Sequence, residues 1–165
     1  MEARETVVLP SGQGRMGWLG GLGVRFMIPG AATGEGFALV EHPLKPRALA
    51  APLHRHSRED EYSFVLRGRV GAQLGEKVLY GGPGDLIFKP RDQWHTFWNA
   101  GDTEASLLEM IAPAGFERFF EKLLEVFGGG PPEPEAIAGV AVDYGLELDF
   151  ASLPRLVTEH GVRFG

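Results

Sequence analysis

The sequence contains no cysteine among its 165 residues. Disulfide bonds, thiolate metal ligands and a cysteine nucleophile are therefore excluded, so any metal ion must be held by histidine and oxygen ligands. No apolar run approaches the roughly 20 residues of a transmembrane helix. Residues 1–5 also lack the basic start and the apolar stretch of a signal peptide. From these absences we expect a cytoplasmic protein with no membrane partner.

Basic residues are scarce toward the end of the chain. Residues 116–165 contain nine acidic and four basic side chains and account for most of the formal net charge of −6. Helical patterns in this region could suggest a DNA-binding module, but phosphate contacts made by basic residues supply most of the affinity for DNA. We therefore expect no nucleic-acid partner and interpret the acidic residues as the solvated outer faces of helices.

Glycine and proline, by contrast, are abundant, with 24 and 12 residues respectively. They separate short apolar runs, a pattern typical of an all-β protein with many tight turns. Strands are predicted over residues 24–28, 37–41, 62–66, 70–74, 77–80, 86–89, 95–98 and 105–111. Glycines at positions 75, 81, 82 and 84 lie between such runs. They favour hairpins and therefore antiparallel neighbours.

The pattern changes after Pro113. Apolar residues recur at helical spacing between Phe116 and Phe127, with charged residues between them, which predicts an amphipathic helix. Residues 128–134 predict a linker, and helical patterns follow over 135–144 and 152–160. The apolar stripe of the first helix could pack on its own barrel or on that of a partner. The sequence does not choose between these two arrangements.

Three histidines are candidate metal ligands. His54 and His56 are two apart on an extended segment, so both imidazoles point to one side of a strand while Arg55 points to the other. A carboxylate from residues 59–61 and His95 from a distant strand would complete a mixed nitrogen and oxygen shell. Divalent transition metals favour ligands of this kind.

Two further residues near these histidines are relevant. Alternation places Phe97 on the same side of its strand as His95, where it could line an apolar substrate pocket. His42 follows an apolar run and precedes Pro43. We interpret His42 as a surface residue at the end of a strand.

The histidine-rich segment resembles the first sequence motif of the cupins. That motif is G-x5-H-x-H-x3,4-E-x6-G, and it is matched by His54, His56, Glu61 and Gly68. Ala48 stands in place of the leading glycine. Two linked motifs at family spacing are far more specific than a single H-x-H pattern.

The second cupin motif, G-x5-P-x-G-x2-H-x3-N, is matched by Gly84, Pro90, His95 and Asn99. Asp92 replaces its middle glycine. Aspartate tolerates the left-handed backbone conformation better than most residues, so we expect the turn to survive this replacement.

The resemblance is to compact single-domain cupins similar to the small bacterial proteins related to quercetin 2,3-dioxygenase. It implies an all-β fold, an antiparallel double-stranded β-helix or jelly-roll barrel, with a C-terminal α-helical tail. Residues 1–115 would form the cupin barrel, including the N-terminal strands, and residues 116–165 a helical tail packed on it within the same single domain. Cupins are commonly dimers, so we also expect a homodimer.

The resemblance also implies the metal site. It assigns His54, His56, Glu61 and His95 as ligands of one divalent transition metal ion, and its spacing favours Glu61 over the rival carboxylate of Asp60. Three imidazoles and one carboxylate leave open coordination positions, as a reactive site requires. These ligands do not distinguish iron, manganese, nickel, cobalt, copper and zinc.

The reaction type comes from the resemblance alone. The leading hypothesis is an enzyme, a metal-dependent dioxygenase and hence an oxidoreductase, that acts on a small oxygenated aromatic or enol-like molecule with Glu61 as the catalytic base. One alternative is a metal-dependent sugar isomerase or epimerase, although a phosphosugar would demand a basic cluster and Arg55 points away from the site. Another alternative is a cupin that binds a small ligand without catalysis.

Overall fold

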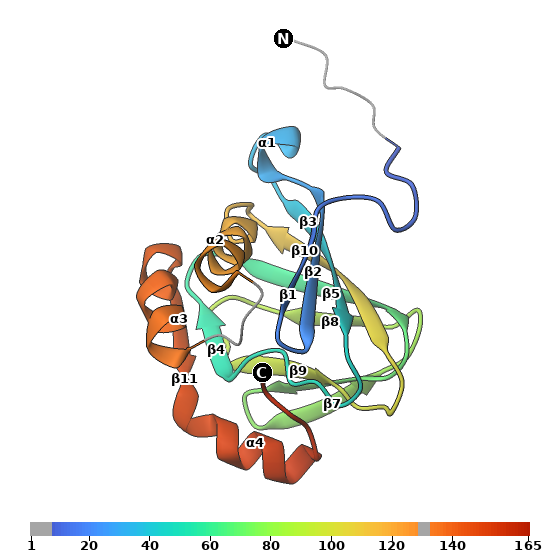
Figure 1. Ribbon diagram of the computed structural model, residues 1–165, viewed down its shortest axis with the longest axis vertical. Helices are drawn as coiled ribbons and strands as arrows, with labels where there is room; N and C mark the ends of the chain where they lie inside the picture. Colours follow the sequence, from blue (N-terminus) through green and yellow to red (C-terminus); the bar gives the residue numbers. More distant parts are fainter. Residues whose placement is uncertain (1–7, 129–132) are drawn as a thin grey trace.

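The computed structural model describes residues 8–128 and 133–165 and contains two antiparallel β-sheets that face one another (Figure 1). The first sheet contains, in order, β1 (Met16–Leu19), β2 (Leu22–Ile28), β3 (Ala38–Leu44), β10 (Ala105–Ala112), β5 (Asp60–Arg67) and β8 (Leu86–Lys89). The second contains β11 (Leu146–Asp149), β4 (Leu53–His56), β9 (His95–Asn99), β6 (Val70–Leu74) and β7 (Lys77–Gly81). The predicted antiparallel jelly-roll architecture with C-terminal helices is confirmed.

Apart from the short α1 (Gly30–Thr33), the helices follow β10 along the chain, with β11 lying between the last two of them. They are α2 (Glu117–Phe127), α3 (Pro134–Ala141) and α4 (Leu153–His160), with 3-10 turns η1 (Val142–Tyr144) and η2 (Phe150–Ser152). Figure 1 shows α2 and α3 on the side of the barrel where β4 and β11 lie. The linker predicted over residues 128–134 lies mostly outside the described residues. Among the described residues, no helix has the length and apolar character needed to cross a bilayer.

The C-terminal segment also contributes a strand that the sequence patterns did not predict. The strand β11 pairs with β4 in antiparallel register, with Leu148 opposite His54 and Leu146 opposite His56. The C-terminal segment therefore completes the sheet that carries two of the candidate ligands.

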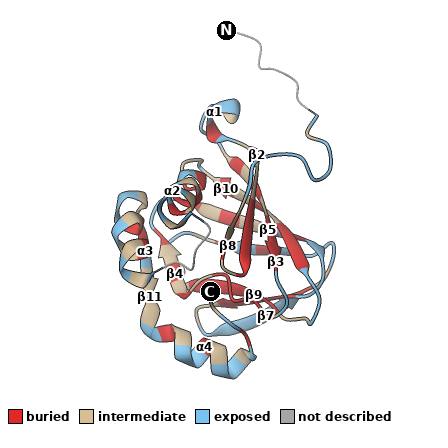
Figure 2. Ribbon diagram, in the orientation of Figure 1, coloured by how far each residue is buried: buried red, intermediate tan, exposed pale blue. Residues whose placement is uncertain are grey.

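Inward-facing apolar side chains fill the space between the sheets. Figure 2 shows in red the stretches of the strands that are buried. The apolar stripe of α2 joins this core, because Phe119, Phe120 and Leu123 are buried against it. Glu117, at the start of α2, accepts hydrogen bonds from the backbone amides of Gly30 and Gly115 at 3.0 and 2.6 Å. The helix therefore packs on its own barrel.

The turn before β9 retains its shape despite the replaced glycine. Asp92 adopts a left-handed conformation with φ of 62°, as expected for the middle position of the second motif. Its backbone amide donates a 2.7 Å hydrogen bond to the carbonyl of His56, which ties the turn to β4.

We expect Asp92→Val to lower the free energy of unfolding by about 1–2 kcal/mol, because a β-branched side chain is strained in the left-handed region. The matched variant Asp92→Gly removes that strain and should stay within about 0.5 kcal/mol of the wild type. Urea denaturation measures both differences. Equal losses in the two variants would contradict this view of the turn.

Candidate metal centre

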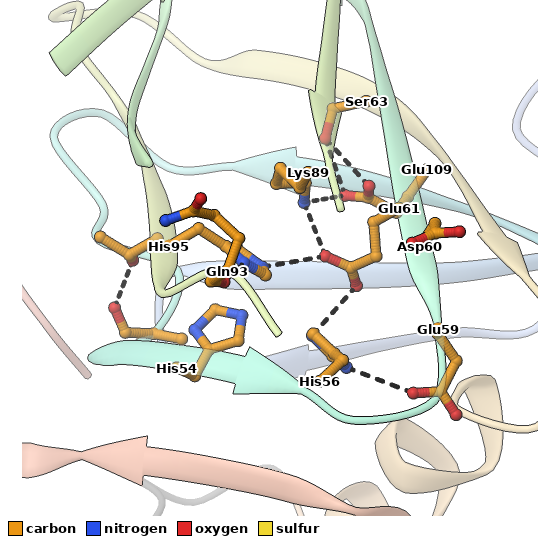
Figure 3. Close-up of polar contacts among 12 residues, drawn as sticks. His54, His56, Glu59, Asp60, Glu61, Ser63, Lys89, Gln93, His95 and Glu109 are labelled. Atoms are coloured by element: carbon orange, nitrogen blue, oxygen red, sulfur yellow. Dashed lines mark hydrogen bonds and ion pairs between the residues drawn. The ribbon is translucent and has the colours of Figure 1, made fainter. Parts of the chain in front are cut away.

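Four candidate ligands converge inside the barrel (Figure 3). His54 and His56 come from β4, Glu61 from β5 and His95 from β9, and each offers a ligand atom within 4.8 Å of the others. All four side chains are buried. Strand pairing places His54 directly opposite His95. Two paired strands of one sheet and a strand of the facing sheet thus bring residues from distant parts of the sequence into one cluster.

Backbone carbonyls fix the orientation of two of the imidazoles. Nδ1 of His54 lies 2.9 Å from the carbonyl oxygen of Pro52, and Nδ1 of His95 lies 2.9 Å from that of Gln93. A carbonyl oxygen only accepts, so Nδ1 carries the proton in both rings and Nε2 presents its lone pair. Burial lowers the pKa of both histidines, and repulsion from the other two imidazoles adds to this effect at His54. Both rings are therefore neutral, as metal ligation requires.

The contact between His95 and Glu61 is unfavourable unless a cation lies between the two side chains. Nε2 of His95 lies 3.2 Å from Oε2 of Glu61. Since the proton of the neutral ring is on Nδ1, this contact brings a lone pair against a carboxylate oxygen. A cation between such atoms removes the repulsion.

The surroundings of His56 also indicate a site for a cation. Both ring nitrogens are buried without a hydrogen bond, which is costly for polar atoms. Nε2 lies 3.5 Å from Oε1 of Glu61, and Nδ1 lies 3.6 Å from Oε2 of Glu59. A metal ion at Nε2 would satisfy one nitrogen, and Glu59 is placed to orient the ring through the other. The residues present therefore fit a metal ion.

A buried lysine holds the carboxylate ligand. Nζ of Lys89, on β8, lies 2.9 Å from Oε2 of Glu61 and 3.0 Å from Oε2 of Glu109, on β10. Burial alone would raise the pKa of Glu61, but the ammonium group of Lys89 holds it well below its usual range. Glu61 is therefore ionised and oriented.

Glu109 is the second partner of this lysine. Burial raises the pKa of Glu109 to about 7, although Lys89 and the hydroxyl of Ser63, which donates to it at 2.9 Å, oppose the rise. Sequence reasoning missed both Lys89 and Glu109. The available signal was alternation, because Lys89 shares the inward face of β8 with Ile87, and Glu109 lies between Leu107 and Ile111 on the inward face of β10.

The rival carboxylate lies elsewhere. Asp60 accepts a 2.8 Å hydrogen bond from the backbone amide of Arg91 and pairs with its guanidinium at 2.8 Å. Arg55 points away from the cluster, as alternation predicts, and pairs with Glu147. Of the three candidate carboxylates, Glu61 lies among the three imidazoles, Glu59 faces only Nδ1 of His56, and Asp60 faces Arg91.

A cavity of about 70 Å³ opens beside the ligands. Its polar lining residues are His42, His54, Glu61 and Glu109. The rest of its wall is mostly aliphatic and aromatic, including Phe97, Phe116, Phe119, Phe120 and Leu123. Phe97 lines the cavity as the sequence suggested. The interpretation of His42 as a surface residue was wrong, because its side chain is 1% exposed and faces the barrel interior from β3.

We expect Glu61→Ala to weaken binding of Mn²⁺ or Zn²⁺ by more than the roughly tenfold that loss of a supporting residue outside the ligand shell costs. Asp60→Ala is the matched control, because its carboxylate contacts Arg91 outside the cluster. Isothermal titration calorimetry of metal-free protein measures both affinities. Equal affinities in the two variants would remove Glu61 from the ligand set.

Comparison with known sequences identifies the domain type. Residues 41–111 match the sequence profile of the cupin domain. This segment contains all four candidate ligands together with Lys89 and Glu109. A search of curated proteins gave no significant match.

Solved structures show the same fold. KdgF from Halomonas sp. superposes with a TM-score of 0.61 at 14% identity, over 69% of this chain and 99% of that one. An RmlC-like cupin from Shewanella frigidimarina gives a TM-score of 0.57 at 18% identity, over 70% and 99% of the two chains. The nucleoside dehydratase Pac13 from Streptomyces gives 0.55 at 13% identity, over 69% and 88%. Identities this low support the fold and not a shared activity. Residues 41–111 therefore match the cupin domain, and the chain has the cupin jelly-roll fold.

Proposed function

We propose that this protein is a metal-dependent dioxygenase that acts on a small, largely apolar molecule carrying an enol or phenol oxygen. The observation that carries the proposal is that the four candidate metal ligands lie directly beside an apolar cavity. Two of them, His54 and Glu61, line this cavity. A reacting oxygen can therefore approach the ligands while the rest of the molecule contacts aromatic side chains. Such a pocket orients its ligand through a few polar groups in an apolar wall.

The size of the cavity limits the substrate. Its volume of about 70 Å³ is well below that of an engineered cavity of about 150 Å³ that admits benzene. A one-ring molecule would need small movements of side chains such as Phe119 and Phe120. A three-ring flavonol would need far larger ones, so we propose a substrate smaller than quercetin.

The composition of the wall weighs against a phosphosugar. Among the described residues that line the cavity there is no arginine or lysine. The nearby Lys89 is already paired with two carboxylates. Apart from the proposed metal ion, a phosphate group would therefore meet the acidic Glu61 and Glu109 and no unpaired cationic side chain in the described wall, which is unfavourable.

A divalent ion held by His54, His56, Glu61 and His95 would supply Lewis acidity and lower the pKa of a substrate enol or phenol. The residue that accepts the released proton should have a pKa close to the pH at which the reaction takes place. Glu61 was the candidate base from the family resemblance, but Lys89 lowers its pKa and makes it a weak base. Glu109 lines the same cavity and has a pKa of about 7, which suits a general base at neutral pH.

The test is oxygen consumption by protein loaded separately with nickel, manganese, iron and cobalt. Pentane-2,4-dione and catechol serve as a small enol and a small oxygenated aromatic. We expect uptake with at least one metal, loss of more than about 100-fold in His56→Ala, which removes a ligand, and near-normal rates in Asp60→Ala.

Two outcomes would overturn the proposal. Absence of oxygen uptake across the metals and probes would remove the dioxygenase assignment. Full activity in His56→Ala would remove the metal from the reaction. Conversion of a probe without oxygen uptake would instead favour an isomerase.

We also propose that the protein forms a homodimer through the outer face of the first sheet. In an antiparallel sheet with one buried face, the outward residues are normally polar. Here large apolar side chains point outward from three adjacent strands, β10, β5 and β8; we call this set the outer apolar face. Its members are Tyr62, Phe64, Leu66, Leu86, Phe88, Leu108 and Met110.

The chemistry of the outer apolar face favours a second copy of the same chain. None of its members is charged, so the face is complementary to itself, as a two-fold contact requires. Phe64, Leu66, Leu86 and Phe88 are 41%, 43%, 60% and 48% exposed. At roughly 100 Å² for each half-exposed large side chain, these four residues supply about 400 Å², half of the ~800 Å² per partner of a standard interface, and the less exposed members and the rim of the face would have to supply the rest.

Light scattering should give twice the chain mass of 17.9 kDa for the wild type. We expect Leu86→Glu to yield monomers, because Leu86 is the most exposed member of the outer apolar face and a charge there would be buried in the interface without a partner. Val142→Glu is the matched control, since Val142 is 74% exposed on η1 and should leave the dimer intact. A monomeric wild type at micromolar concentration would overturn the proposal.

A further inference from the structure

His42 lies in the cavity wall on β3, away from both cupin motifs, and takes no part in the metal cluster. Its Nδ1 lies 2.9 Å from the backbone carbonyl oxygen of Gly23 on β2. Because a carbonyl only accepts, Nδ1 carries the proton. Burial lowers the pKa of His42 to about 4, which keeps the ring neutral at physiological pH. Its Nε2 therefore presents a lone pair.

This lone pair has no partner among the described residues. No hydrogen bond to Nε2 of His42 occurs in residues 8–128 and 133–165, although the side chain is only 1% exposed. Nε2 is also not one of the fully enclosed polar atoms, and the ring lines the cavity. The unused acceptor is therefore open to the cavity. A buried acceptor without a partner is costly, and a ligand that donates a hydrogen bond would remove the cost.

An aromatic wall connects His42 with the metal cluster. The ring of Phe97 lies 6.0 Å from the His42 ring, and Nζ of Lys89 lies 4.6 Å from the centre of the Phe97 ring. Lys89 in turn contacts Glu61. Phe120 packs edge-on against His42 at 5.1 Å. A planar molecule lying on Phe97 would thus have the ligand cluster at one end and His42 at the other.

We infer that His42 is a specificity-determining residue that accepts a hydrogen bond from a hydroxyl or N–H group at the far end of the substrate. The inference rests on the proposed function above and narrows its substrate class to one-ring molecules with two polar ends. The oxygens of a para-dihydroxybenzene are about 5.5 Å apart, and a hydrogen bond of about 2.8 Å at each end extends this to roughly 11 Å. Phe97, which contacts both His42 and Lys89, gives such a molecule a flat apolar surface to lie on.

The experiment compares hydroquinone with 4-methoxyphenol, in which a methyl group replaces the hydroxyl hydrogen that could be donated to His42. Zinc-loaded protein without oxygen binds without turning over, so calorimetry measures affinity alone. The wild type should bind hydroquinone about tenfold more tightly, the value of one hydrogen bond to a buried acceptor. In His42→Phe the preference should disappear, and in His42→Gln, which offers an amide oxygen, it should partly return.

A measurement on the unmodified protein guards against variants that fold poorly. The ¹⁵N resonance of His42 Nε2 should shift on addition of hydroquinone and stay in place with 4-methoxyphenol. Equal affinities of the wild type for the two phenols, or a preference retained in His42→Phe, would overturn the inference while leaving oxygen uptake and the proposed function intact. Binding of neither phenol would overturn both this inference and the substrate class.

Discussion

The site depends on one buried cation, the ammonium group of Lys89. It lies between the carboxylates of Glu61 and Glu109 with almost no exposure, and burial would strongly disfavour its charge without them. The two acidic partners instead raise the pKa of Lys89 above its ordinary value. Removing one member of such a group typically costs about 3–5 kcal/mol, because an uncompensated charge stays buried. The triad therefore fixes the position of Glu61 and links β5, β8 and β10 inside the barrel.

The C-terminal segment makes the environment of this triad apolar. The strand β11 extends the sheet that carries His54 and His56, and α2 places phenylalanine side chains over the cavity. Phe116 packs edge-on against His56 with ring centres 4.3 Å apart. An apolar cover excludes water and strengthens each electrostatic contact beneath it. The helices are thus part of the site, although the ligands themselves lie on the barrel strands.

Sequence reasoning found the features that depend on local spacing. The H-x-H pair, the distant His95 and the left-handed turn at Asp92 follow from alternation and from the cupin motifs. Alternation places Lys89 and Glu109 on the inward faces of their strands, but it does not show that the two side chains meet. The pairing of β5 with β8 and β10 brings them together with Glu61, so that their charges neutralise one another. The strand β11 was missed because its stability comes from pairing with β4 and not from its own four residues.

The residues that choose a substrate are separate from those that would hold the metal. Proteins of this fold differ in chemistry while sharing little sequence, so four ligands on a common barrel do not define a reaction. In this chain the cavity wall supplies the distinguishing chemistry. Its aromatic lining disfavours highly hydrated groups. Glu109 and His42, on neighbouring strands, provide hydrogen-bond partners. The charge of Lys89 is already balanced by two carboxylates, so it does not attract an anion. Under the proposed function, a hydroxylated apolar molecule satisfies all of these conditions, whereas a phosphorylated one would bring further negative charge beside Glu61 and Glu109 with no basic side chain in the described wall to balance it.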